Sequence, residues 1–235
     1  MAEQPTSSLI VFLDIEKFGE RSDGVAADLR ESMYRIVGEA LTKAGIPGVR
    51  HVEDRGDGLL ILLPDAGPVE VIGAFVRDLE SLVRHRAASR TPAYQMRLRV
   101  AIEHGFVRND GNGWISRAIN TAARMVGAAA LRAAMSDHPD AHVAVIISDD
   151  LYHEVVAQGH PSLDATRYRE VVVQEKEIDA RAWVHVPYVG SGSGARPRPA
   201  DPPGNSVIGN QVMGDQHISG DFTGMTVQMP FPGAP

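Results

Sequence analysis

The sequence predicts an α+β fold in which helices pack against a mainly antiparallel sheet. Apolar runs typical of buried strands alternate with amphipathic segments in the order strand, helix, hairpin, helix, strand, helix, strand, with two further strands at the end. The turn sequence RGDG separates two of the strands and is typical of an antiparallel hairpin. No Gly-x-Gly-x-x-Gly follows the first strand, which excludes the common dinucleotide-binding fold.

The strand predictions are based on apolar content and on alternation. LIVFL is apolar throughout, as expected for a strand that is covered on both faces. In MRLRVAIEHG, apolar residues alternate with charged ones, which is typical of a strand with two different faces. The predicted strands span residues 9–13, 49–53, 59–63, 96–105, 143–148, 168–173 and 182–187.

The helix predictions are based on apolar residues that recur every three or four positions. This pattern covers residues 24–44, after which Gly45 is a candidate C-cap. It recurs over residues 68–85, and a third helix is predicted over residues 116–135. A short helix that ends near Val156 has Ser148 or Asp149 as its candidate N-cap.

Composition excludes several classes of protein. The chain has 235 residues, with 23 basic and 30 acidic side chains and a net charge of −7, so a surface that binds nucleic acid by neutralising phosphates is not expected. The absence of cysteine excludes disulfides and thiolate metal sites. There is no apolar run long enough to cross a membrane and no signal-peptide pattern at the N-terminus, so we expect a soluble, cytoplasmic protein.

The composition changes sharply near the C-terminal end. Residues 1–189 are predicted to form one globular domain, and residues 190–204, GSGSGARPRPADPPG, are typical of a flexible linker. Residues 205–235 form a low-complexity tail in which glycine recurs between short β-prone pieces. This tail resembles bacterial amyloid-type interaction motifs that template onto a matching motif in a partner, although a disordered tail is an equal alternative.

Two aspartates stand at the ends of predicted strands. Asp14 follows the first strand, and Asp57 lies in the turn of the hairpin. If these strands are neighbours, the two carboxylates converge at one edge of the sheet. Paired carboxylates without thiolates or clustered imidazoles suit hard cations such as Mg²⁺ or Mn²⁺, and two such ions can clamp the oxygens of a phosphoryl transfer. The alternative is that each aspartate merely forms a turn.

Four segments resemble the motifs of the class III nucleotidyl cyclases. They are FLDIEKFGERSD at residues 12–23, VEDRGDG at 52–58, LRVAIEHG at 98–105 and AINTAARM at 118–125. They occur in the order and spacing of that family, and the resemblance covers roughly residues 8–188. It implies a class III cyclase-like sandwich with a ferredoxin-like palm, and a site that forms between two copies of the chain in a homodimer.

The resemblance also implies roles for individual residues. Asp14, Asp57 and the carbonyl oxygen of Ile15 would bind two divalent cations, Mn²⁺ or Mg²⁺. Asn120 would orient the ribose of a ribonucleoside triphosphate, and Arg124 would stabilise charge on the α-phosphate. Further contacts with the nucleotide are implied for Phe12, Lys17, Phe18, Glu53, Arg55, Gly113 and Lys176. Lys17 stands where the family usually has glycine.

The base that the site would accept depends on three positions. Glu53 and Gly113 occupy the base-reading positions; adenine is poorly supported by this pair, whereas guanine stays open because guanylate cyclases carry glutamate at the first. Arg55 replaces a small apolar residue, takes volume that a purine needs and offers donors to a pyrimidine.

The chain therefore most resembles the pyrimidine cyclases of the Pycsar antiphage system, which make cyclic UMP or cyclic CMP for a separate effector. UTP is favoured over CTP by family prevalence alone. The alternatives are a guanylate cyclase, or a catalytically silent nucleotide-binding module that acts through its tail. Another open alternative is that Arg55 is a surface arginine paired with Asp54 or Glu53.

Overall fold

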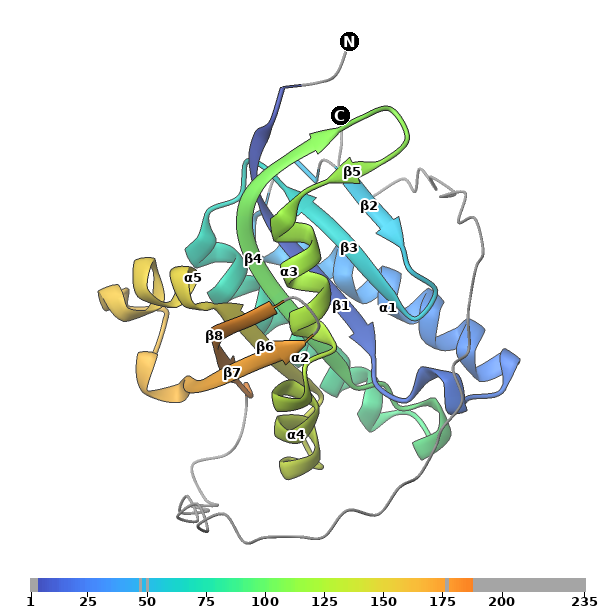
Figure 1. The fold of residues 1–235 in the computed structure, drawn as a ribbon. Helices are drawn as coiled ribbons and strands as arrows, with labels where there is room; N and C mark the ends of the chain where they lie inside the picture. The colour runs from blue at the N-terminus through green and yellow to red at the C-terminus, as the bar shows by residue number, and fades with distance from the viewer. Residues whose placement is uncertain (1–3, 47, 50, 176–177, 188–235) are drawn as a thin grey trace, which may run out of the picture.

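The computed structural model describes residues 4–46, 48–49, 51–175 and 178–187, and shows helices packed on both faces of one mixed sheet (Figure 1). The strand order is β2-β3-β1-β4-β6-β8-β7, and β5 pairs with β4. All these pairings are antiparallel except that of β4 with β6, which is parallel. The α+β prediction with a mainly antiparallel sheet is therefore confirmed.

The elements have the following bounds. The strands are β1 (Thr6–Ile15), β2 (His51–Asp54), β3 (Gly58–Leu63), β4 (Leu98–Asn109), β5 (Trp114–Ile115), β6 (Val143–Ser148), β7 (Arg169–Glu175) and β8 (Ile178–His185). The α-helices are α1 (Asp23–Lys43), α2 (Val76–Ala88), α3 (Arg117–Val126), α4 (Ala129–Asp137) and α5 (Asp149–Glu154). A π-helical turn, Glu70–Phe75, leads into α2, and a 3₁₀ turn, Phe18–Glu20, follows β1.

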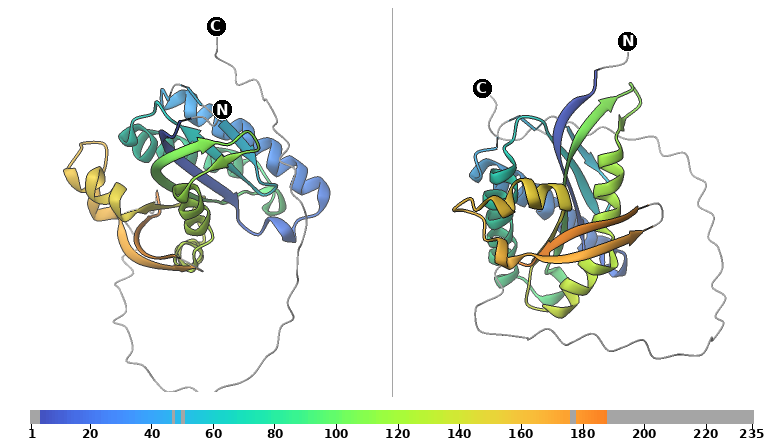
Figure 2. Two further views of the ribbon diagram at one scale, coloured as in Figure 1. Left: turned by 45° about the horizontal axis from the view of Figure 1, so that its top comes forward. Right: turned by 60° about the vertical axis from the view of Figure 1, so that its left-hand side comes forward.

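Strand β1 lies inside the sheet, between β3 and β4, and its side chains alternate between two cores. Leu9, Val11 and Leu13 pack against α1 and α2, whereas Ile10 packs on the opposite face, under α3. The two helix layers on either side of the sheet are visible in Figure 2. Burial on both faces explains why residues 9–13 of this strand are all apolar. It also places Asp14, two residues after Phe12, on the α3 face of the sheet.

The prediction of one helix over residues 116–135 is wrong. The chain forms α3 and α4, separated by Gly127 and by Ala128, whose extended backbone (φ −63°, ψ 142°) starts the second helix. The two helices cover mainly different parts of the sheet: α3 packs chiefly on β1 and β4, whereas α4 packs chiefly on β6 and β7. Because the sheet twists between these strands, one straight helix could not follow both.

Several sequence predictions fall outside the described residues. These are the linker at residues 190–204, the tail at residues 205–235 and the phosphate-binding role of Lys176. Among the residues that the structure does describe, no helix has both the length and the apolar character to cross a membrane.

Candidate active site

The structure brings Asp14 and the Asp57 turn together. Strand β1 pairs with β3 so that Asp14 lies opposite Gly58, and the backbone N–H of Ile15 donates to the carbonyl of Asp57 at 2.9 Å. The end of β1 and the turn between β2 and β3 therefore meet at one edge of the sheet, as the sequence predicted if the strands were neighbours. Asp14 is largely buried, and Asp57 is exposed.

The hairpin turn can approach β1 because of its glycines. A Cβ atom on Gly58 would lie 2.1 Å from the carbonyl oxygen of Leu13, so no larger residue fits there. Gly56 has a φ of 86°, which glycine adopts without steric cost, and its N–H donates to the Asp54 carboxylate at 2.7 Å. The hairpin closes through the Arg55 N–H, which donates to the carbonyl of Gly58 at 2.9 Å.

The Asp14 carboxylate is already paired with a guanidinium. Arg99 on β4 donates from Nε to Oδ1 at 2.8 Å and from Nη2 to Oδ2 at 2.7 Å, a two-pronged contact between adjacent strands. Burial raises the pKa of Asp14 to about 6; Arg99 opposes this shift, whereas the charge of Asp57 adds to it.

The loop that follows Asp14 is anchored by Arg97. The Glu16 N–H donates to the carbonyl of Arg97 at 2.9 Å, and Arg97 Nη1 donates to Glu16 Oε2 at the same distance. Arg97 Nη2 donates to the carbonyls of Met135 and His138 at the end of α4, at 2.6 and 2.9 Å. Arg97 Nε donates to the carbonyl of Ala141 at 2.8 Å. One arginine therefore holds the loop against the C-terminal end of a helix.

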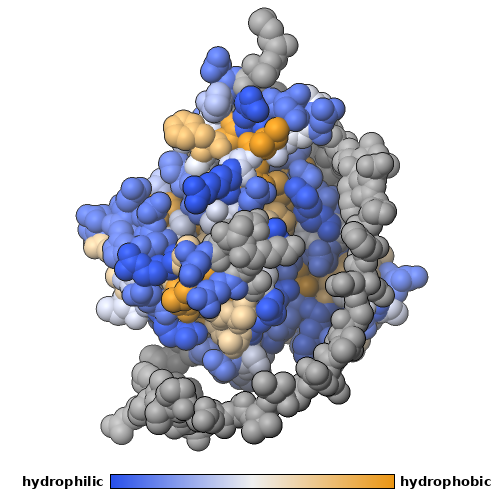
Figure 3. Space-filling model, viewed as in Figure 1, coloured by the Kyte–Doolittle hydropathy of each residue, from blue (hydrophilic) through white to orange (hydrophobic). Residues whose placement is uncertain are grey.

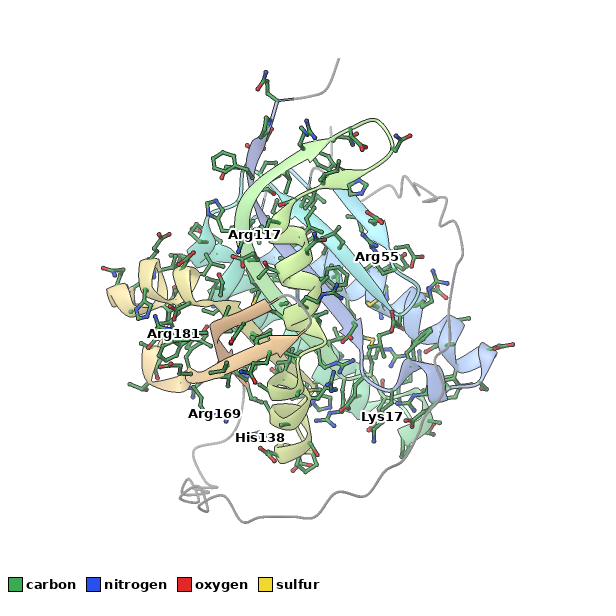
Figure 4. The ribbon with its side chains drawn as sticks, viewed as in Figure 1. Lys17, Arg55, Arg117, His138, Arg169 and Arg181 are labelled. Atoms are coloured by element: carbon green, nitrogen blue, oxygen red, sulfur yellow. The ribbon has the colours of Figure 1, made fainter. Side chains whose placement is uncertain are left out.

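Two predicted nucleotide contacts lie in this loop. Lys17 adopts a left-handed backbone with φ 55° and ψ 35°, at the position where the cyclase motif usually has glycine. Phe18 packs against the core under α1 and α2. Figure 4 shows Lys17 and Arg55 on the same side of the molecule, to the right of α3.

The oxygen groups at this edge fit a hard divalent cation. The Asp14 and Asp57 carboxylates and the Ile15 carbonyl are the type of ligand that Mg²⁺ and Mn²⁺ prefer. Within the described residues, no three His, Cys, Asp or Glu side chains are grouped so that they could hold a metal. A cation here would therefore keep water or substrate oxygens in its remaining positions, as Mg²⁺ commonly does.

A second cluster lies on β2 and on the turn that follows it. The two oxygens of Glu53 face different partners: Oε1 lies 3.0 Å from Arg55 Nη2, and Oε2 lies 3.5 Å from His51 Nε2. The Arg55 guanidinium also stands over the ring of Phe12, 5.9 Å from its centroid. Arg55 thus pairs with Glu53, one of the two partners that the sequence left open.

The other candidate, Asp54, has partners of its own. It pairs with Arg30 on α1 and accepts a hydrogen bond from the Tyr34 hydroxyl. The two acidic residues of β2 therefore serve different ends: Asp54 ties the hairpin to α1, and Glu53 holds Arg55.

Helix α3 carries the other two predicted catalytic residues. Ser116 caps the helix by accepting from the Ala118 N–H at 3.0 Å, and its hydroxyl donates to the carbonyl of Phe106 at 2.8 Å. Ile119 and Ala122 face the sheet, so Asn120 is exposed, and Arg124 follows one turn later on the same side.

Gly113 lies in the tight turn between β4 and β5, where its N–H donates to Asp110 Oδ1 at 3.0 Å. As a glycine it can offer only its backbone to a base. This position therefore lacks the side chain by which a purine would be read.

Comparison of the structure with solved structures identifies similar folds. It resembles an adenylate/guanylate cyclase/hydrolase from Silicibacter pomeroyi with a TM-score of 0.57 and 18% identity, over 80% of this chain and 99% of that one. It resembles the guanylyl cyclase Cya2 with a TM-score of 0.56 and 14% identity, over 80% and 98% of the two chains. This chain has the class III cyclase fold.

The adenylyl cyclase CyaB from P. aeruginosa is a third similar structure, with a TM-score of 0.51, 16% identity and coverage of 78% and 95%. No protein-family model matches the sequence, and no curated protein matches it. The similarity therefore concerns the fold, which agrees with the expectation drawn from the four motifs.

Sequence reasoning missed three residues of the site. The sequence predicts Arg97 and Arg99 only as charged positions on an alternating strand. His51 was treated as an ordinary strand residue, whereas its ring lies beside Glu53 and 5.7 Å from the ring of Trp114. The missing information was the register between strands, which alone shows that Arg99 lies opposite Asp14.

Proposed function

We propose that this chain is a pyrimidine nucleotide cyclase that converts UTP into 3′,5′-cyclic UMP and diphosphate. The ribose 3′-oxygen attacks the α-phosphorus, the bond from that phosphorus to the bridging oxygen of the β-phosphate breaks, and the proton of the 3′-hydroxyl is lost. The single observation that carries the proposal is the meeting of Asp14 and Asp57 at one sheet edge in a cyclase fold.

Different groups of the chain would bind the cations and the phosphates at this edge of the sheet. Two divalent cations, Mn²⁺ or Mg²⁺, held by Asp14, Asp57 and the Ile15 carbonyl, would lower the pKa of the 3′-hydroxyl and offset triphosphate charge. Backbone N–H groups of residues 15–19 would cradle the phosphates. The ammonium group of Lys17 would add a positive charge to the same loop.

The proposed site needs a second copy of the chain. Asn120 is on the exposed side of α3, turned away from the sheet that bears Asp14. An exposed apolar patch on the β4–β5 arm supports such an interface: Phe106 is 69% and Ile115 is 50% exposed. In Figure 3 this patch is the orange area at the top of the molecule. We infer a homodimer with two composite sites, in which one copy supplies the aspartates and the other supplies Asn120 and Arg124.

The Glu53 cluster favours a pyrimidine over guanine. Oε1 of Glu53 pairs with Arg55 at 3.0 Å and Oε2 lies 3.5 Å from His51 Nε2, so a guanine edge would have to compete with these side chains for the carboxylate. Arg55 stands over Phe12 and fills space beside it, while its donors suit the carbonyl oxygens of a pyrimidine. Between UTP and CTP, UTP is proposed because it is the more common substrate in the resembling family. The cyclic nucleotide would then act on a separate effector in antiphage defence.

Product identification tests the substrate. Purified protein is incubated with Mn²⁺ and each of the four ribonucleoside triphosphates, and products are identified by mass spectrometry. Cyclic UMP as the main product supports the proposal. Cyclic GMP as the main product would show that Arg55 moves aside and that the chain is a guanylate cyclase. No cyclic product from any triphosphate would point to a silent nucleotide-binding module.

A pair of variants tests the composite site. Asp57→Asn should abolish turnover without lowering the melting temperature, because Asp57 is exposed. Asp137→Asn, at the exposed end of α4, is the matched control. Asn120→Ala should also lower activity strongly. Mixing the two inactive variants should restore about a quarter of wild-type activity, because half of the dimers pair them and each holds one intact site. No recovery after subunit exchange would contradict the dimer model.

A further inference from the structure

Arg99 and Asp14 form the most complete ion pair at the proposed cation site. Both prongs of the guanidinium are used, at 2.8 and 2.7 Å, and the two side chains are only 15% and 13% exposed. The pair joins neighbouring strands, because Asp14 and Arg99 are directly opposite each other in the β1–β4 register. Both carboxylate oxygens of Asp14 therefore already accept from a cation.

Asp57 differs from Asp14 in this respect. Its side chain is exposed, and within the residues that the structure describes it forms no salt bridge. The two carboxylates that would share a cation thus have different environments. Asp57 is open to solvent, whereas Asp14 is neutralised by a buried guanidinium. A divalent cation that reaches Asp14 meets a positive charge in direct contact with the oxygens that it needs.

We propose that Arg99 is a resident counter-cation, which neutralises buried Asp14 in the metal-free chain and must release a carboxylate oxygen before a divalent cation can bind both aspartates. This inference rests on the metal assignment in the proposed function. A buried carboxylate without a partner is costly, so Arg99 stabilises the empty site. The same contact weakens metal binding, and Arg99 thereby sets the metal concentration at which the site fills.

The competing idea is that Arg99 only fixes the orientation of Asp14 and stays in place when the cation binds. The two ideas predict opposite changes in metal affinity when the charge of Arg99 is removed. If Arg99 competes with the cation, removal of its charge strengthens metal binding. If it only orients Asp14, the same removal weakens metal binding, because the carboxylate then loses its preferred rotamer.

Direct Mn²⁺ binding in the absence of nucleotide separates these two ideas. Free Mn²⁺ is measured by electron paramagnetic resonance for the wild type, Arg99→Met and Arg99→Lys. Arg99→Met should tighten Mn²⁺ binding by at least about tenfold, because a like charge beside the cation is removed. Arg99→Lys keeps the positive charge but cannot form the two-pronged contact with Asp14, so its Mn²⁺ affinity should lie between those of the other two proteins. Unchanged or weaker binding by Arg99→Met would overturn the proposal.

Three further variants complete the experiment. Arg108→Met removes an exposed arginine from the same strand and should leave the Mn²⁺ affinity at the wild-type value. Asp14→Asn and Asp57→Asn should each lose Mn²⁺ binding; if they retain it, the metal assignment itself fails. If both lose binding while Arg99→Met does not gain it, only the counter-cation role fails. If Arg99→Met does not fold, the test uses Arg99→Lys instead. Mn²⁺ binding by Arg99→Lys that is no tighter than that of the wild type would refute the counter-cation role.

Discussion

At Lys17 the sequence departs from the cyclase motif, and the backbone of the same residue is strained. Within the described residues, it is the one non-glycine residue with a positive φ, at 55°. The sequence marked the position because the cyclase motif has glycine there, but only the backbone geometry shows that the left-handed conformation is retained. Strain of this kind persists where surrounding contacts enforce it, and here Arg97 and Glu16 fix the preceding part of the loop.

Replacing Lys17 with glycine should therefore stabilise the chain. The substitution removes the left-handed penalty but adds chain entropy to the unfolded state, so we expect a net gain of up to about 1 kcal/mol in the free energy of unfolding. Urea unfolding of both proteins measures it. Lys17→Ala keeps the Cβ atom and should give no gain; an equal gain from alanine would mean that the charge, not the backbone, is responsible.

The β2–β3 hairpin is the element that brings Asp57 to Asp14. The sequence predicted its two strands and its turn, because alternating apolar runs and RGDG are local signals. The sequence did not predict that β3 pairs with β1; it indicated only that the two aspartates would meet if these strands were neighbours. This condition is met because Gly58 lets the backbone of the turn lie against the carbonyl of Leu13.

Gly58→Ala should separate the hairpin from the end of β1. The added Cβ would lie 2.1 Å from a backbone oxygen that cannot swing away, so we expect a loss of about 2 kcal/mol or more in the free energy of unfolding. Gly19→Ala is the matched control, because a Cβ there meets nothing within 4 Å. Urea unfolding of both variants is the measurement, and an equal effect of the two would show that Gly58 is not tightly packed.

Helices α3 and α4 show the limit of pattern reasoning at the scale of elements. The alanine-rich run from Ala128 to Ala134 fits one continuous helix, and Gly127 alone is a weak sign of a break. The break follows from packing, because α3 covers chiefly β1 and β4 whereas α4 covers chiefly β6 and β7. Helix propensity could not have revealed it.

At the scale of the whole molecule, the stability of the fold depends on pH through His185, which lies outside the candidate site. His185 at the end of β8 stacks on Tyr168, with centroids 4.8 Å apart, and its Nδ1 lies 3.4 Å from the carbonyl of Arg167. Burial lowers the pKa of His185 to about 4. The folded state therefore binds fewer protons than the unfolded state between this value and the ordinary histidine pKa.

The contribution of His185 to the free energy of unfolding should consequently fall as the pH is lowered through this range. A group with a depressed pKa contributes its full stabilisation above pH 6.5 and loses it toward pH 4, on the order of 3 kcal/mol in total. Asp14 acts in the opposite direction, because its raised pKa favours the folded state at low pH. Urea unfolding of the wild type and of His185→Gln at several pH values isolates the histidine, since Asp14 is common to both. Parallel curves would refute the prediction.

The sequence by itself determined the order of most strands and helices, the turn chemistry of RGDG and the set of cyclase-like motifs, because apolar periodicity and turn residues act over a few positions. Glu53, Arg55, Asn120 and Arg124 could be proposed as site residues for the same reason: each lies within a short motif.

The tertiary structure alone decided which of these residues meet. Arg99 holds Asp14 across 85 positions of sequence, and Arg97 joins the loop after β1 to the end of α4. These contacts depend on strand register and on how helices follow a twisted sheet, both of which are set by packing between distant segments. Local sequence carries no record of that packing, so the partner of Asp14 could be known only from the fold.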